Sequence, residues 1–375
     1  MTWLDLRVSR VVGGVMVLAL MLASFSVANA QSGVWTTSGG GTYSGTGNWQ
    51  GGIVANGAGN TADFSTRNIS GDATVTFDSS RTLGHLAFGD TDLDSAGVWT
   101  IVETGGSVLT LNNGASSPTI TANPLTPLGP AFDDTYFDIG LAGPNGFTKL
   151  GSGILTLDGN RNTISGTVNV NEGTLRLGNS FIYSEDGSTP IAQTINQFNL
   201  GNGATLSTAG AISNVAVANN ATATLNITAG SVNVTELTAA GPGETLNLNV
   251  ALGNVTVTAG ANWTGFENLN ITGQTVGSPG FLRLVPNNSF GGAPPATNTA
   301  SFANTRLHLD NMTTTVRTNS QGNTVEIGQL SGTSTAALNG GNAGTAARYQ
   351  IGGVETHPEI PWKNKRGGGN LFNKK

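Results

Sequence analysis

Short segments in which apolar and polar residues alternate recur along most of the chain. The clearest lie at 73–78, 107–112, 154–157, 166–170, 173–177, 223–227, 231–234, 244–248, 254–257 and 267–271. Most are bounded by Asp, Asn, Ser or Gly, which favour turns. A period of two places every second side chain on one face, so each segment predicts a half-buried β-strand.

The spacing of these strands favours a solenoid. The segments alternate between short and long separations, as expected when several strands form one coil of a repeating structure. A five-residue strand is not stable alone, but stacked coils can enclose a narrow apolar core. Asn side chains on successive coils can also form hydrogen-bonded ladders. The fold class predicted is all-β, a parallel β-helix (β-solenoid). A β-sandwich is the alternative, because Asp158-Gly159 and Asn339-Gly340 are typical hairpin turns.

Composition excludes several other classes. Of 375 residues, 55 are Gly, 37% are hydrophobic and 10% are charged. The hydrophobic content argues against disorder, the glycines lack the strict period of collagen, and abundant Gly, Asn and Thr disfavour helix. No Cys is present, so stability must come from burial and backbone pairing alone.

Residues 1–30 are expected to be a signal peptide. Arg7 and Arg10 precede an apolar run at 11–27, and Ala28-Asn29-Ala30 has the small-x-small pattern of a cleavage site. A transmembrane anchor is the alternative. No later segment is apolar enough to span a membrane as a helix, so we expect no transmembrane helix in the mature chain, which would begin at Gln31.

Charge is unevenly distributed along the chain. Residues 31–356 hold 9 Lys and Arg against 20 Asp and Glu, a net charge of −11, which disfavours binding to nucleic acid. The stretch 357–375 instead carries four of the five Lys residues. We interpret this basic tail as disordered or non-native. The alternative is a tail that binds an anionic glycan or lipid.

A motif at 146–178 resembles a known family. The run GFTKLGSGILTL at 146–157 is followed by NTISG at 162–166 and VNEGTL at 170–175. These closely resemble the autotransporter-associated β-strand repeat of bacterial passenger domains. The resemblance implies a right-handed parallel β-helix displayed at or beyond the cell surface. We therefore expect a β-rich region and solenoid cap at 31–145 and the solenoid itself at 146–356.

Catalytic motifs are absent from the sequence. There is no Gly-x-Ser-x-Gly, His85, His308 and His357 have no suitably spaced partners, and without Cys a zinc site is not expected. Acidic residues look scattered and 31–356 holds a single Lys, unlike the clustered carboxylates of polysaccharide-cleaving β-helices. We expect no enzymatic activity; a polysaccharide lyase or hydrolase is the alternative.

One group of residues has the composition of a metal site. Asp90, Asp92 and Asp94 alternate in a Gly-flanked turn, and carboxylates at this spacing could bind Ca²⁺. The EF-hand pattern fails, because Ser95 and Ile101 stand where Gly and Glu are required. The alternative is a solvated acidic loop, and no other cofactor is expected.

Aromatic residues gather in the amino-terminal third, namely Trp35, Tyr43, Trp49 and Trp99. We expect them to cap the open end of the solenoid, whose first coil would otherwise expose its core. A carbohydrate-binding platform is the alternative, because sugar rings stack on exposed aromatic faces.

Together these features predict a non-enzymatic, exported surface or secreted protein, structural or adhesin-like. The alternative is a polysaccharide-binding or polysaccharide-degrading β-helix. The expected partners are cell-surface glycans or other extracellular proteins.

Overall fold

The computed structural model describes residues 30–94, 97–125, 134–183, 191, 194–228, 232–234, 237–241, 243–250, 255–259, 265–273, 281–286, 301–310, 315–318, 324–333, 337–339, 348–352 and 371–374. The regular secondary structure of the described part is almost entirely β-strand, as predicted. Its helices are the four-residue α1 (Asn179–Ile182) and two short 3₁₀ turns, η1 (Thr46–Asn48) and η2 (Gln50–Gly52).

The strands of the described residues form three sheets. Sheet I has 14 strands: β2 (Gly40–Thr42), β4 (Ala73–Phe77), β6 (Trp99–Glu103), β9 (Thr135–Asp138), β12 (Ile154–Leu157), β15 (Thr174–Leu177), β17 (Thr205–Thr208), β19 (Thr222–Ile227), β22 (Thr245–Val250), β24 (Asn268–Gly273), β26 (Ser301–Asp310), β28 (Thr324–Gly332), β30 (Arg348–Ile351) and β31 (Leu371–Lys374).

Sheet II has 12 strands: β1 (Gly33–Val34), β3 (Gly57–Phe64), β5 (Arg81–Phe88), β7 (Val108–Leu111), β8 (Thr119–Ala122), β10 (Gly140–Gly143), β11 (Phe147–Leu150), β13 (Thr163–Ile164), β14 (Gly166–Val170), β16 (Ile195–Leu200), β18 (Asn214–Val217) and β21 (Leu237–Ala239). Sheet III has five: β20 (Val232–Val234), β23 (Val255–Ala259), β25 (Phe281–Pro286), β27 (Thr315–Thr318) and β29 (Ala337–Asn339).

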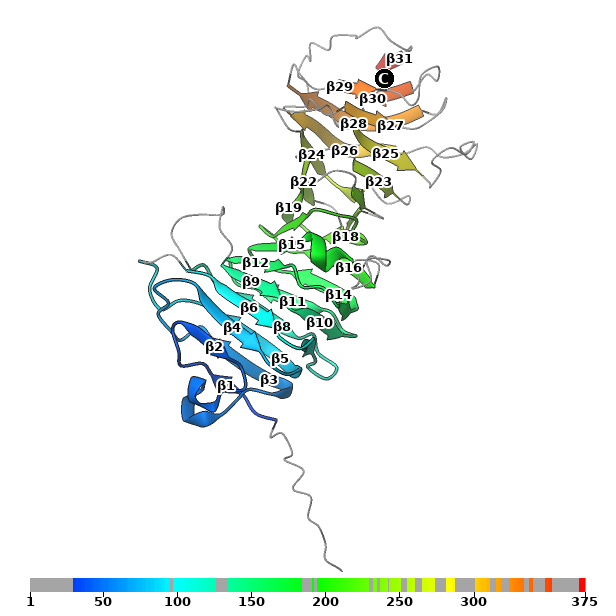
Figure 1. Cartoon of the computed structure of the whole chain (residues 1–375). Coiled ribbons are helices and arrows are strands. Elements are labelled where there is room, and N and C mark those ends of the chain that lie inside the picture. Colours follow the sequence, from blue (N-terminus) through cyan, green and yellow to red (C-terminus); the bar gives the residue numbers. More distant parts are fainter. Residues whose placement is uncertain are drawn as a thin grey trace, which may run out of the picture.

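Strands of one coil pair with those of the next coil. β12 pairs with β9 before it and β15 after it, and β14 pairs with β11 and β16, all in parallel. Figure 1 shows the coils stacked from β1 to β31 as an elongated body. The fold is therefore a parallel β-helix, and the β-sandwich alternative is wrong, because a sandwich requires antiparallel neighbours.

The core consists of apolar rows that run across the coils. In sheet I one inward row is entirely aliphatic over seven strands, from Leu155 through Leu175, Leu206, Leu225, Leu248 and Ile271 to Leu309. All seven side chains are buried. Full burial of a side chain of this size contributes about 1.5–3 kcal/mol, so the row as a whole is a major source of stability.

A cluster of aromatic side chains fills the first coils. Trp35 and Trp49 meet edge to face with ring centroids 5.0 Å apart, and Tyr43 packs against both Trp49 and Phe77. The Trp49 Nε1 group donates to the Tyr43 carbonyl at 2.6 Å, and the Tyr43 hydroxyl donates to the Ala55 carbonyl at 2.9 Å. These polar atoms are thus satisfied inside the core.

The stacking continues across the expected boundary at 145 and 146. β11 of the repeat pairs with β8 from the preceding region, with Thr148 opposite Thr119. The expected signal peptide lies outside the described residues except for Ala30. Of the expected tail, the structure describes Leu371–Lys374, which forms β31 and pairs with β30. Within the described residues no helix is long and apolar enough to cross a membrane.

Candidate functional surface

Hydrogen-bonded amide ladders cover part of the outer face of sheet I. Asn249 Nδ2 donates to Asn226 Oδ1 at 2.8 Å, and Asn270 Nδ2 donates to Asn247 Oδ1 at 2.9 Å. The predicted Asn ladders are confirmed here. We call Asn226, Asn247, Asn249 and Asn270 the amide face; these side chains are partly exposed, uncharged and held in a regular array by β19, β22 and β24.

A second polar row lies on sheet II. Asn199 Nδ2 donates to Asn169 Oδ1 at 2.8 Å, and Asn169 Nδ2 lies 3.4 Å from Thr148 Oγ1. In the preceding coils His85 Nδ1 lies 2.7 Å from Thr119 Oγ1. His308 on sheet I pairs in the same way with Ser331 Oγ, at 2.8 Å. Both histidines therefore belong to the ladders between coils.

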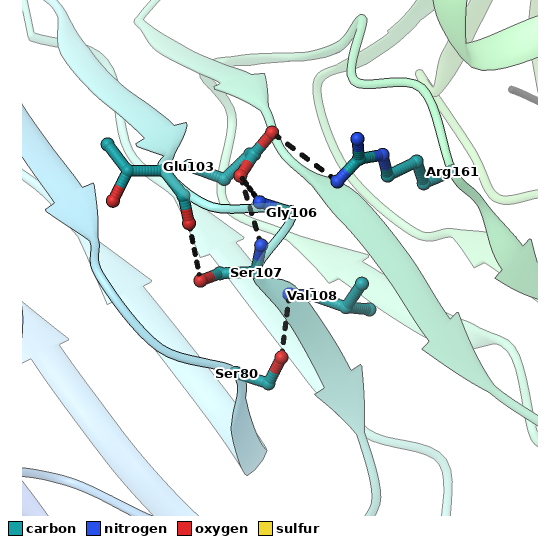
Figure 2. Close-up of polar contacts among 7 residues, drawn as sticks. Ser80, Glu103, Gly106, Ser107, Val108 and Arg161 are labelled. Atoms are coloured by element: carbon teal, nitrogen blue, oxygen red, sulfur yellow. Dashed lines mark hydrogen bonds and ion pairs between the residues drawn. The ribbon is translucent and has the colours of Figure 1, made fainter.

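An acidic corner forms where three successive strands of sheet I end. Figure 2 shows its first member, Glu103, whose Oε2 accepts the N–H groups of Gly106 at 2.7 Å and Ser107 at 3.0 Å. Its Oε1 lies 3.9 Å from Arg161 Nη1, which comes from a loop two coils further on. Glu103 thus closes its own turn and links coils that are far apart in the sequence.

The other members of the acidic corner are Asp138 and Asp158. Asp138 is exposed at the end of β9, and slight desolvation together with the negative charges of Asp158 and Glu103 raises the pKa of its carboxyl. Asp158 Oδ2 accepts the Tyr136 hydroxyl at 2.8 Å, and its Oδ1 accepts the Ser180 N–H at 3.0 Å. The expectation that acidic residues are scattered is wrong at this corner, because coil stacking aligns strand ends separated by 20 or more residues.

Two of the three aspartates of the calcium prediction, Asp90 and Asp92, act as hydrogen-bond acceptors, and Asp94 donates its backbone N–H. Asp90 Oδ1 accepts the N–H groups of Ile69 at 3.3 Å and Asp92 at 3.1 Å, and Asp92 Oδ1 accepts the Asp94 N–H at 3.2 Å. Asp92 also accepts from the Asn68 amide. Among the described residues no group of three acidic, His or Cys side chains is arranged to hold a metal. Calcium at this loop stays a prediction.

The four aromatic residues weighed as a carbohydrate platform are buried. Trp35, Tyr43 and Trp99 have no exposed area and Trp49 has 2%. A sugar ring needs an open aromatic face, so these side chains do not form a platform.

Lys149 of the repeat motif is also buried. It takes an inward position between Ile120 of β8 and Val170 of β14. Its Nζ donates to the carbonyls of Leu150 at 3.2 Å, Gly151 at 2.5 Å and Glu172 at 3.1 Å. The ammonium group thus joins the corners of two successive coils.

The class defined by this geometry is a parallel β-helix with buried aliphatic rows and polar ladders outside. A family described as passenger-associated-transport-repeat matches residues 147–177, in agreement with the repeat expected at 146–178. The adhesin BmaC autotransporter of Brucella suis biovar 1 (strain 1330) is 35% identical over 191 residues, covering 50% of this chain and 5% of that protein. No solved structure matches the chain.

These matches show that residues 147–177 carry a passenger-associated-transport-repeat and that half of the chain is similar to part of an autotransporter adhesin. The chain spans about 5% of the length of the adhesin relative.

Proposed function

We propose that this protein is a non-enzymatic, adhesin-like passenger whose outer face binds macromolecules outside the cell. The observation that carries the proposal is the similarity to an autotransporter adhesin over half of the chain. A stacked β-helix supports such a role physically, because a long rigid face offers many weak contacts at once.

The amide face is the part of the surface that we expect to make these contacts. Its amides keep donors and acceptors available at the surface while the ladder bonds hold them in place. Preorganised polar groups lose little conformational entropy on binding. Uncharged amides also suit neutral glycans and polypeptide backbones, which is compatible with the cell-surface glycans or other extracellular proteins expected from the sequence.

The test is attachment of beads coated with residues 31–375 to cultured animal cells. Attachment well above that of beads coated with the heat-denatured chain is expected. Asn249→Lys should reduce attachment, because it places a charge on the amide face. Thr74→Lys adds the same charge to an exposed position on β4 and should leave attachment unchanged. Equal attachment of native and denatured chains would refute the proposal.

A polysaccharide-degrading activity is the alternative, and the acidic corner is the observation that favours it. Asp138, with its raised pKa, lies between two further carboxylates, which is the kind of environment a general acid needs. Incubation with a panel of bacterial and host polysaccharides tests it. Release of reducing or unsaturated ends by the native chain, and none by Asp138→Asn, would support this activity in place of the adhesin-like function.

A further inference from the structure

Glu244 is a fully buried carboxylate at the corner that leads into β22. Its exposed fraction is 0%, and among the described residues neither Oε1 nor Oε2 has a hydrogen-bond partner. A buried charge without a partner costs several kcal/mol, so native proteins pair such groups or use them to bind metals. Among the described residues this carboxylate therefore has no positive partner.

The backbone fixes Glu244 in the coil. Its carbonyl accepts the N–H groups of Glu267 at 3.0 Å and Asn268 at 3.1 Å, both from the next coil. Leu246 and Leu248, which follow at the inward positions of β22, are buried as well. Because Glu244 belongs to the same alternating set, its side chain is held on the core side of the corner.

Other side-chain oxygens gather at the same turn. A Cβ atom placed on Gly241 would lie 2.9 Å from Asn219 Oδ1 and 3.4 Å from Glu244 Oε1. One placed on Gly243 would lie 2.6 Å from Asn220 Oδ1 and 3.8 Å from Glu267 Oε2. Oxygens from three successive coils thus surround two residues without side chains. We call Asn219, Asn220, Glu244 and Glu267 the oxygen corner.

The charge at the oxygen corner is negative. Glu267 uses its other oxygen, Oε1, to pair with Arg306 Nη1 at 2.6 Å. That ion pair balances Glu267, and no ion pair within the described residues compensates Glu244. The net charge of −11 over residues 31–356 raises the local concentration of cations further.

We propose that the oxygen corner binds a hard divalent cation, with Glu244 as the charged ligand and Asn219 and Asn220 as amide ligands. Ca²⁺ fits this chemistry, because it takes oxygen ligands from carboxylates, amide side chains and water in flexible geometry. A cation here would tie three successive coils together through their corners. It would also supply the positive partner that Glu244 lacks.

The test is thermal unfolding and titration calorimetry of residues 31–375, treated with chelator and then measured with added Ca²⁺. The expected result is heat of binding and a rise in melting temperature. Glu244→Gln keeps the shape of the side chain but removes its charge, and should abolish both. Asn219→Ala, at an exposed position where folding is not at risk, should weaken binding.

The matched control is Asp72→Asn, at an exposed carboxylate outside both the oxygen corner and the acidic loop of Asp90, Asp92 and Asp94, which should leave the calcium response intact. Loss of the response in Asp92→Asn with retention in Glu244→Gln would overturn the proposal and place the ion in that loop. Absence of any response in the native chain would overturn it as well. A Glu244→Gln variant that is more stable than the native chain at every Ca²⁺ concentration would also overturn the proposal. The buried carboxylate would then only destabilise the fold and would bind no cation.

Discussion

A single residue of the repeat, Lys149, shows how an ionisable group is accommodated in an aliphatic row. Three backbone carbonyls satisfy its ammonium group, and Asp134 and Glu172 lie close enough to favour its charge. Burial still dominates and lowers the pKa of Lys149 to about 8. The Lys149 side chain therefore hydrogen-bonds the corners of two successive coils. The loss of water around its ammonium group opposes this stabilisation.

The pKa of Lys149 predicts a pH dependence of stability. Between about pH 8 and pH 10.5 the unfolded chain keeps the Lys149 proton while the folded chain releases it. The free energy of unfolding should therefore contain a contribution that rises with pH across this window, by at most about 1.4 kcal/mol per pH unit. Urea denaturation at several pH values measures it.

The matched variant is Lys149→Met, which keeps a long apolar side chain and has no titrating group. Its stability should be lower overall, because three carbonyls lose their donor. Its pH dependence above pH 8 should be flatter than that of the native chain. An identical slope in both proteins would mean that Lys149 does not titrate in this range.

At the scale of the element, each strand depends on the coils above and below it. β19 pairs with β17 on one side and β22 on the other, and its Leu225 lies between Leu206 and Leu248. Strands of four to six residues bury too little surface to persist alone. Neighbouring coils therefore share their stability, as in other solenoids.

Leu225→Ala should destabilise the protein by about 2–5 kcal/mol, because it removes buried atoms and leaves a cavity. Hydrogen exchange should show lost protection in β17 and β22 as well as in β19. Thr222→Ala, at the exposed start of the same strand, should have little effect. Loss of protection confined to β19 would contradict shared stability between coils.

At the scale of the whole molecule, parallel pairing sets the dimensions. The 14 strands of sheet I lie side by side along the axis. Because neighbouring strands are about 4.8 Å apart, the described stack is about 62 Å long. The outer faces of the sheets are available along this length, which is the geometry expected of a passenger domain that presents an extended surface.

Small-angle X-ray scattering of residues 31–375 should therefore give an elongated particle, with a maximum dimension of at least about 60 Å. The expected distance distribution is asymmetric with a long tail. A symmetric distribution with a smaller maximum dimension would contradict the stacked arrangement.

The features of the surface differ in how far they could be predicted. The Asn ladders followed from Asn at outward positions of alternating strands, because identical positions on adjacent coils must meet. Glu103, Asp138 and Asp158 each end a strand or follow one directly, which is a readable signal only once the pairing of the coils is known. Glu244 gave no signal at all, since an acidic residue before a strand is ordinarily exposed.

The sequence by itself determined the strand content and the repeat and favoured the parallel coil over a β-sandwich, because these depend on local alternation and on short motifs such as GFTKLGSGILTL. Only the tertiary structure decided how deeply each side chain is buried. It buried Trp35, Tyr43 and Trp49 in the first coils, placed Lys149 in an apolar row and left Glu244 inside a corner. The physical reason is that alternation fixes which face a side chain points to, whereas burial depends on what the next coil brings into contact with it.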